Sequence, residues 1–337
     1  MSSQPSTDPN GDTAAHSNFK TDTTPRTNTR TRTDKKMDTE CQQFQLSAQE
    51  QDLKTQAQVE AISQEIKATQ NLTSEIIPIS KLSNPFEPGT DFREGCDYLA
   101  SKYKSYRAIR GDGNCYYRAF LYALCETLYN DNSNSNGNSV DNTDTSRAEL
   151  KRIQEFVDQS IEQVVQCGYD RFTIETFHEE MVDLLAAIVI AKDKDKDKEE
   201  SSKESSEPSE SSFSKIHEML NEENSTSDYC VWYLRVIASA YLKADPDRFI
   251  HFLDDPNYTD VATYCAREID PMGRECDMVG VLALAEAFGV CVEIEYMDGK
   301  ELVNGKLVKH SFGGDGEDSA LCITLLYRPG HYDILYK

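Results

Sequence analysis

The residues best suited to do chemistry lie in a short loop, residues 111–115, with the sequence GDGNC. Gly111 and Gly113 permit a tight turn, and the apolar run after Cys115 favours a helix. This pattern predicts a loop that delivers the thiol of Cys115 to a helix N-terminus. There the helix dipole and free backbone amides stabilise an anion, so the thiol can ionise and act as a nucleophile.

A histidine and a carboxylate lie two residues apart near the other end of the chain, at His331 and Asp333. Residues i and i+2 of a strand share one face, so the imidazole and the carboxylate can lie side by side. A thiol, a base and an acid that orients the base are the three parts of a thiol hydrolase. The residues alone leave alternatives open: Cys115 as a core cysteine, His331 as a surface histidine and Asp333 as an ordinary edge-strand acid.

Both segments resemble the otubains, a branch of the ovarian-tumour (OTU) family of deubiquitinating cysteine proteases. The nucleophile loop of that family carries Asp, Gly, Asn and Cys followed by Tyr-Arg-Ala-Phe, as in residues 112–120 here, and its C-terminus is similar to residues 326–336, LYRPGHYDILY. Three segments between them resemble otubain segments in the same order: residues 225–229, 270–272 and 295–298. The resemblance covers about residues 92–337.

The resemblance implies that Cys115 is the nucleophile and His331 the general base. We expect Asp333 to hold the imidazole in the useful tautomer through the ring nitrogen that faces away from sulfur. Asp112 matches a loop aspartate that is grouped with the otubain catalytic residues. Because a carboxylate close to a thiolate opposes its ionisation, we expect Asp112 to bind loop amides instead.

An oxyanion hole is expected in the same loop. The backbone amides of residues 112–115, with Gly113 and Asn114 at their centre, would hold the tetrahedral oxyanion. Tyr116 follows the nucleophile where otubains often have Phe, which is a conservative change.

The implied function is that of a thiol-dependent isopeptidase that cleaves ubiquitin from polyubiquitin or from conjugates. The family prefers the chain linkage that marks proteins for the proteasome. Its surface for the distal ubiquitin maps near residues 249–258 and 296–305. The candidate ubiquitin contacts are Phe249, Phe252, Tyr258 and Tyr296.

Two other functions compete with hydrolysis of ubiquitin linkages. Some otubains bind and inhibit a charged ubiquitin-conjugating enzyme without cleaving anything, and catalysis needs Cys115 whereas this binding does not. A hydrolase of another ubiquitin-like modifier is the third alternative, and it would need a different fit to the C-terminal tail of its substrate.

Composition excludes several classes of partner and cofactor. The net charge of −24 and the pI of about 4.6 argue against nucleic acid and anionic membranes, which both reward basic patches. The ten cysteines form no C-x-x-C pair and the six histidines do not cluster, so we expect neither a zinc site nor any other cofactor. Free thiols, no signal-peptide core and no long apolar run predict a soluble protein of the cytoplasm, with the nucleus as a second location. We also expect a monomer.

Domain organisation follows from changes of composition along the chain. Residues 1–40 are polar, with Phe19 as their only aromatic, and predict a disordered tail. Residues 41–91 are rich in Gln and Glu and predict an arm with a conditional helix. Residues 92–337 form the expected catalytic domain. Two polar stretches interrupt it and predict disordered insertions, at 130–144 and 192–212.

The expected fold class is α+β: a papain-like OTU cysteine protease fold with helices around a small, mainly antiparallel sheet. Apolar periodicity predicts helices within residues 92–106, 150–165, 177–188, 229–242 and 278–288. Thr173 is the expected N-cap of the third helix. The C-terminal part predicts strands at 290–296, 321–327 and 332–336, the first of them half-buried.

Overall fold

The computed structural model describes residues 32–130, 142–201, 212–253, 257–314 and 321–337. The chain divides into two compact units, residues 1–59 and residues 60–337. Helix α1 (Arg32–Thr69) contributes to both. Its side chains between residues 50 and 59 are exposed, including Leu53. All other described elements belong to the second unit, which carries the chemistry.

A six-stranded sheet runs through the second unit in the order β1-β2-β6-β5-β3-β4. Its strands are β1 (Ile77–Pro78), β2 (Ser105–Arg107), β3 (Cys291–Tyr296), β4 (Val308–Phe312), β5 (Cys322–Arg328) and β6 (His331–Tyr336). Strands β3 and β5 are parallel, and every other neighbouring pair is antiparallel. The sheet is therefore mainly antiparallel, and the predicted α+β class is confirmed.

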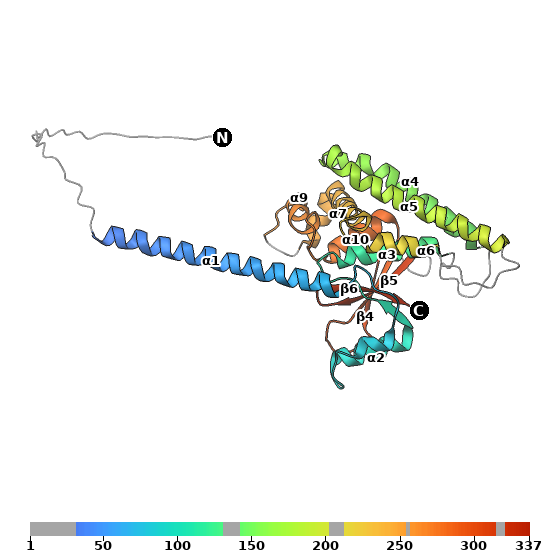
Figure 1. Cartoon of the computed structure of the whole chain (residues 1–337), viewed down its shortest axis with the longest axis horizontal. Helices are drawn as coiled ribbons and strands as arrows, with labels where there is room; N and C mark the ends of the chain where they lie inside the picture. Colours follow the sequence, from blue (N-terminus) through green and yellow to red (C-terminus); the bar gives the residue numbers. More distant parts are fainter. Residues whose placement is uncertain (1–31, 131–141, 202–211, 254–256, 315–320) are drawn as a thin grey trace, which may run out of the picture. The chain divides into compact units, whose positions relative to one another are not determined.

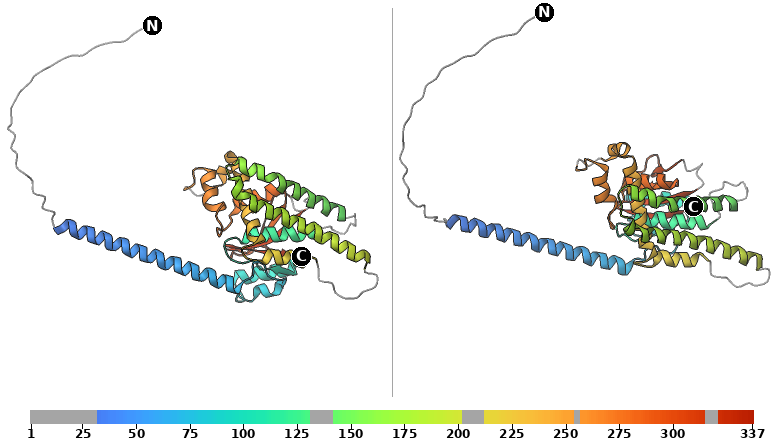
Figure 2. Two further views of the ribbon diagram at one scale, coloured as in Figure 1. Left: turned by 45° about the horizontal axis from the view of Figure 1, so that its top comes forward. Right: turned by 90° about the horizontal axis from the view of Figure 1, so that it is seen from above.

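Helices cover one face of this sheet (Figure 1). They are α3 (Cys115–Tyr129), α4 (Asn142–Gln166), α5 (Arg171–Ser201), α6 (Phe213–Asn221), α7 (Thr226–Ala244) and α10 (Met278–Phe288), with the short α8 (Pro246–Phe249), η2 (Ile250–Phe252), α9 (Val261–Tyr264) and the π-helical η3 (Cys265–Ile269). Figure 2 shows the long helices α4 and α5 side by side. The other face carries α2 (Asp91–Lys102) and η1 (Ile79–Ser83).

The sheet therefore has a hydrophobic core on each face. Successive residues of β6 enter different cores, Ile334 the larger one and Leu335 the smaller one. Strand β3 is likewise covered on both faces, so the expectation of a half-buried strand is wrong. Its Glu295 is fully buried. Its Oε1 accepts hydrogen bonds from Lys102 Nζ at 2.9 Å and the Tyr103 hydroxyl at 2.8 Å, which replace water at that oxygen.

The catalytic unit begins earlier than residue 92. Leu72, Ile79 and Leu82 are buried, and β1 pairs with β2. The segment after α1 is thus part of the fold and not a linker. Residues 1–31 of the predicted tail lie outside the described residues, whereas the structure places residues 32–40 in α1.

The two predicted insertions also need correction at their edges. Helix α4 begins at Asn142, and α5 continues to Ser201, so residues 192–201 are helical rather than disordered. Lys192 is buried because its ammonium binds the carbonyl oxygens of Leu128 and Tyr129 at 3.0 Å, at the C-terminus of α3. Residues 131–141 and 202–211 lie outside the described residues.

Most predicted helices and strands are found close to their expected bounds, and α10 has the predicted ones. The predicted cap of α5 is wrong. That helix begins at Arg171, and the Asp170 carboxylate accepts from the amide of Thr173 at 3.0 Å.

Candidate active site

The nucleophile loop ends at the first residue of α3, which is Cys115. Gly113 has a φ of 76°, a conformation that side chains other than glycine rarely adopt. A Cβ on Gly113 would lie 2.1 Å from the carbonyl oxygen of Gly273, so a side chain is excluded for a second reason. The glycine therefore lets the loop turn sharply and pack against the backbone of residue 273, with the thiol at the helix start.

His331 is the first residue of β6, which lies between β2 and β5 and packs against α3. Its Nε2 lies 3.0 Å from Oδ1 of Asp333, and the Cys115 thiol is a second group that interacts with the ring. Burial lowers the pKa of His331, but the bonds to Asp333 and Cys115 outweigh it and raise that pKa to about 9. The structure thus brings together the thiol of Cys115, the imidazole of His331 and the carboxylate of Asp333.

Asp333 is fully buried and orients the imidazole from behind. Its Oδ1 also accepts from the amide of Ile109 at 3.0 Å, and its Oδ2 pairs with the guanidinium of Arg328. Burial raises the pKa of Asp333, but the hydrogen bond with His331 and the charge of Arg328 more than reverse this and lower it. The carboxylate is therefore held charged and fixed in place.

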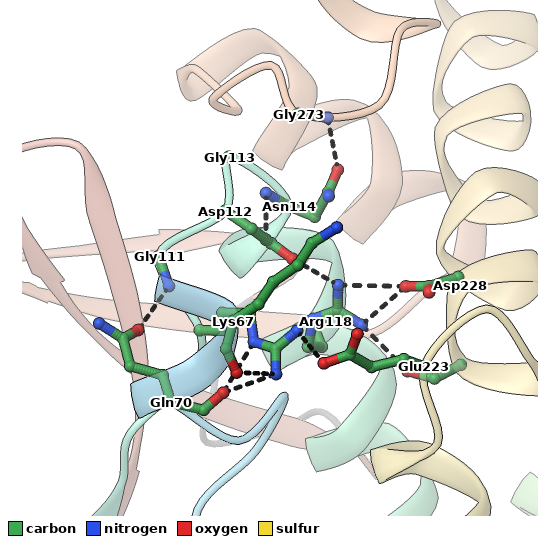
Figure 3. Close-up of polar contacts among 12 residues, drawn as sticks. Lys67, Gln70, Gly111, Asp112, Gly113, Asn114, Arg118, Glu223, Asp228 and Gly273 are labelled. Carbon is green, nitrogen blue, oxygen red and sulfur yellow. Dashed lines mark hydrogen bonds and ion pairs between the residues drawn. The ribbon is translucent and has the colours of Figure 1, made fainter. Parts of the chain in front are cut away.

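The carboxylate of Asp112 binds its own loop and Arg118 (Figure 3). Its Oδ1 accepts from the amide of Asn114 at 2.9 Å, and its Oδ2 accepts from Arg118 at 2.9 Å. Arg118 is buried and also contacts Ser227 and Asp228 at the start of α7. Asp112 thus ties the loop to α3 and α7.

The role expected for the Asn114 amide in the oxyanion hole needs correction. That amide is taken by Asp112, and the Asn114 side chain accepts from Gly273 N at 2.9 Å and from Arg235 at 2.8 Å. Among the described residues, no hydrogen-bond acceptor is found for the amides of Gly113 and Cys115. These two amides remain available in the loop.

Two arginines that hold the loop escaped the sequence reasoning. Arg235 of α7 is fully buried and contacts Gly113 and Asn114. Arg110 binds the carbonyl oxygen of Gln70 just after α1 at 2.9 and 2.6 Å. The Gln70 side chain in turn accepts from the amide of Gly111 at 3.1 Å (Figure 3). A charge inside the apolar run of α7 was the one signal for Arg235.

The candidate ubiquitin contacts differ in how far their side chains are buried. Phe249 is fully buried against Tyr241 and Phe252, so its assignment as a surface contact is wrong. Phe252 is 50% exposed and lines a cleft of about 470 Å³ with Tyr258. Tyr296 lines a second cleft, of about 460 Å³. Met278, at the start of α10, lines both clefts and is itself exposed, so they adjoin.

No group of three or more His, Cys, Asp or Glu side chains among the described residues could hold a metal ion. In the same residues, no helix has the length and apolar character needed to cross a membrane.

Comparison with known proteins agrees with this geometry. The chain matches the family "Peptidase C65 Otubain" over residues 64–337. It is 33% identical to the human ubiquitin thioesterase OTUB1 over 282 residues, which cover 83% of this chain and 89% of that protein. It is 30% identical over 271 residues to the Arabidopsis thaliana "OVARIAN TUMOR DOMAIN-containing deubiquitinating enzyme 1", with 77% and 78% covered.

Solved structures show the same relationship. The complex of h/ceOTUB1 with ubiquitin aldehyde and UBCH5B~Ub superposes with a TM-score of 0.66 at 30% identity, covering 85% of this chain and 98% of that one. The corresponding UBC13~Ub complex gives a TM-score of 0.67 at 30% identity, with the same coverage. The family match, residues 64–337, includes every residue of the candidate active site. The chain therefore belongs to the otubain family of cysteine peptidases, peptidase C65.

Proposed function

We propose that this chain is a deubiquitinating thiol isopeptidase that releases ubiquitin from polyubiquitin, with the proteasome-targeting linkage as its preferred chain. One observation carries the proposal: a thiol at a helix start lies beside an imidazole that is hydrogen-bonded to a buried carboxylate, in an otubain-family chain. The names of the relatives support ubiquitin as the substrate.

The reaction follows from the positions of Cys115 and His331. The imidazole takes the thiol proton, and the thiolate attacks the carbonyl carbon of the ubiquitin C-terminal glycine. Because the pKa of His331 is about 9, the imidazolium form predominates at neutral pH and can protonate the departing lysine amine. Water, deprotonated by the imidazole, then hydrolyses the thioester and releases ubiquitin.

The developing oxyanion needs donors beside Cys115. In this proposal, the amides of Gly113 and Cys115 supply them, assisted by the partial positive charge at the start of α3. Asp112 acts indirectly, by fixing the loop through Asn114 and Arg118.

The distal ubiquitin would lie over the adjoining clefts that meet at Met278. Phe252 and Tyr258 line one cleft and Tyr296 the other, which provides an apolar surface with polar tips. Exposed Met and aromatic side chains are enriched in the cores of protein interfaces.

A panel of diubiquitins tests the proposal. Cys115→Ala should abolish both cleavage and labelling by a ubiquitin C-terminal electrophile, and His331→Ala should cost nearly as much because the two groups act as a unit. Cys167→Ala is the matched control, since that half-buried thiol lies at the end of α4 and should be dispensable. Labelling of Cys115→Ala at the wild-type rate would exclude Cys115 as the nucleophile.

The second candidate is binding and inhibition of a charged ubiquitin-conjugating enzyme. It is favoured by the structural similarity to OTUB1 in complexes that contain UBCH5B~Ub and UBC13~Ub. Inhibition of ubiquitin transfer by Cys115→Ala would demonstrate this function, because binding does not need the thiol. Loss of inhibition with the thiol would instead attribute the effect to hydrolysis.

Removal of residues 1–59, which include the first part of α1, tests whether this segment binds a second ubiquitin. A chain that starts at residue 60 keeps the whole catalytic unit. We expect it to cleave the preferred diubiquitin more weakly but a small fluorogenic ubiquitin ester or amide equally well, because only the first substrate has a proximal ubiquitin. Equal losses on both substrates would mean that residues 1–59 support the fold.

A further inference from the structure

Arg235 is a fully buried arginine in the middle of α7. Its Nη2 donates to the carbonyl oxygen of Gly113 at 3.0 Å, to Asn114 Oδ1 at 2.8 Å and to the carbonyl oxygen of Arg274 at 2.6 Å. Its Nη1 donates to the carbonyl oxygen of Ile269 at 2.9 Å. One guanidinium therefore joins the nucleophile loop to the segment 269–274.

No carboxylate among the described residues pairs with the charge of Arg235. Its hydrogen-bond acceptors among the described residues are three carbonyl oxygens and one amide oxygen, and its planar face covers the ring of Tyr117 at 4.3 Å. Burying a cation without an anionic partner is expensive, and a chain that needed only packing would be better served by an apolar residue here. The position therefore calls for a functional explanation.

The peptide unit between Gly113 and Asn114 is held at both ends. Its carbonyl oxygen accepts from Arg235, and its N–H donates to Asp112 at 2.9 Å. A peptide that follows a glycine with positive φ can rotate at little steric cost. If this one rotated, the Gly113 carbonyl would leave Arg235 and the Asn114 N–H would leave Asp112, so the carbonyl could turn toward the thiol side of the loop.

We propose that Arg235 is a positioning residue that locks the Gly113–Asn114 peptide, so that the Gly113 carbonyl points away from the oxyanion site and does not compete there with an oxyanion for the amides of Gly113 and Cys115. The role of these amides rests on the proposed function, whereas the lock itself is a property of the free protein. Arg235 touches neither the substrate nor the thiol in this account.

Kinetics with a diubiquitin substrate give the first test. Arg235→Gln should lower kcat by about 10- to 100-fold, the loss typical of a catalytic group displaced by an ångström, and should leave KM within about twofold. Arg235→Lys keeps the charge and one of the contacts, so it should recover part of kcat.

Amide hydrogen exchange gives a test that needs no substrate. The Asn114 amide is protected by Asp112 only while the peptide is locked, so its exchange should be faster in Arg235→Gln than in the wild type. Alkylation of Cys115 by iodoacetamide, followed on its own peptide by mass spectrometry, should slow in the same variant. Both measurements stand if the chain proves to cleave no ubiquitin substrate.

Arg152→Gln is the matched control. Arg152 also binds backbone carbonyl oxygens, those of Phe288 and Gly289, but does so at the far end of α10. It should lower the melting temperature without changing kcat or the exchange of Asn114. If Arg235→Gln fails to fold, Arg235→Lys decides: wild-type kcat together with wild-type Asn114 exchange in that variant would overturn the proposal, as would a kcat of Arg235→Gln within twofold of the wild type.

Discussion

Replacement of Asp333 by asparagine should lower the pKa of His331. The carboxylate contributes both a hydrogen bond and a negative charge to the imidazolium. Asparagine can still accept from the amide of Ile109, so the backbone contact can persist. The charge is lost, and burial of the ring then favours the neutral imidazole.

The magnitude follows from the pKa of His331 in the intact site. A rise from 6.5 to about 9 is worth roughly 3 kcal/mol in favour of the imidazolium. Asp333 and Cys115 share this effect against the opposing effect of burial, and Asp333 contributes the first of the raising interactions. If Asp333 supplies half of it, the pKa of His331 in the variant falls by at least about one unit, since one pKa unit is worth about 1.4 kcal/mol.

Nuclear magnetic resonance titration of the histidine ring protons measures this directly. The chain has six histidines, and the His331→Gln spectrum identifies the signal of His331. Asp298→Asn is the matched control, because it removes a carboxylate paired with Lys300 in the turn after β3 and should leave the pKa of His331 unchanged. The same Asp333→Asn variant should lose roughly 100-fold or more in kcat through the misplaced tautomer.

The outcome that refutes the reasoning is a His331 pKa in Asp333→Asn equal to that of the wild type. It would mean that Cys115 alone raises the pKa, and that Asp333 serves only to hold Arg328 and the amide of Ile109.

Three further predictions follow. The pKa of His331 is about 9 in the folded state and 6.5 in the unfolded state. Its contribution to the free energy of unfolding is therefore complete below pH 6.5 and is lost as pH rises through about 9. Urea denaturation at several pH values should show this loss, and His331→Gln should abolish it. Gly113→Ala should abolish activity, because its Cβ would meet the backbone of Gly273. Gly89→Ala is the control: Gly89 has a similar φ of 81° but open space around its Cβ, so this variant should only lose about 1 kcal/mol of stability. Thermal melts of both variants check the prediction. Lys192→Met should lower the free energy of unfolding by roughly 1–3 kcal/mol, since it removes the ammonium that donates to the last two carbonyls of α3, while kcat stays unchanged. A melting temperature equal to that of the wild type would argue that these two contacts contribute no stability.

The sequence predicted the parts of the site whose local pattern is sufficient. A glycine loop before a cysteine and a Pro-Gly turn before a histidine are short-range signals, and the structure places Cys115 and His331 at a helix start and a strand start. The long apolar runs gave α7 and α10 for the same reason.

What the sequence did not predict depends on contacts between distant segments. Strands β1 and β2 are too short to show a period, and only the pairing of β1 with β2 and of β2 with β6 defines them. Glu295 alternates with apolar residues as a solvent-facing position would, yet Lys102 at the end of α2 and the buried Tyr103 after it bind its carboxylate. Lys192 lies in a run with the composition of a disordered segment. In the structure it belongs to α5, and its ammonium binds the C-terminus of α3, which is distant in sequence.

Arg235 recognises backbone atoms, and this has a consequence for how the family can diverge. Its acceptors at positions 269 and 274 are carbonyl oxygens, which every amino acid supplies. In related sequences, side chains at these two positions should drift freely, whereas an insertion or deletion between them should be rare because it would move the carbonyls. Gly113 and Gly273 should both be retained, since a Cβ at position 113 would meet the backbone at 273 and Gly273 itself has a φ of 77°. Length, more than identity, is the trait that selection should preserve in this segment.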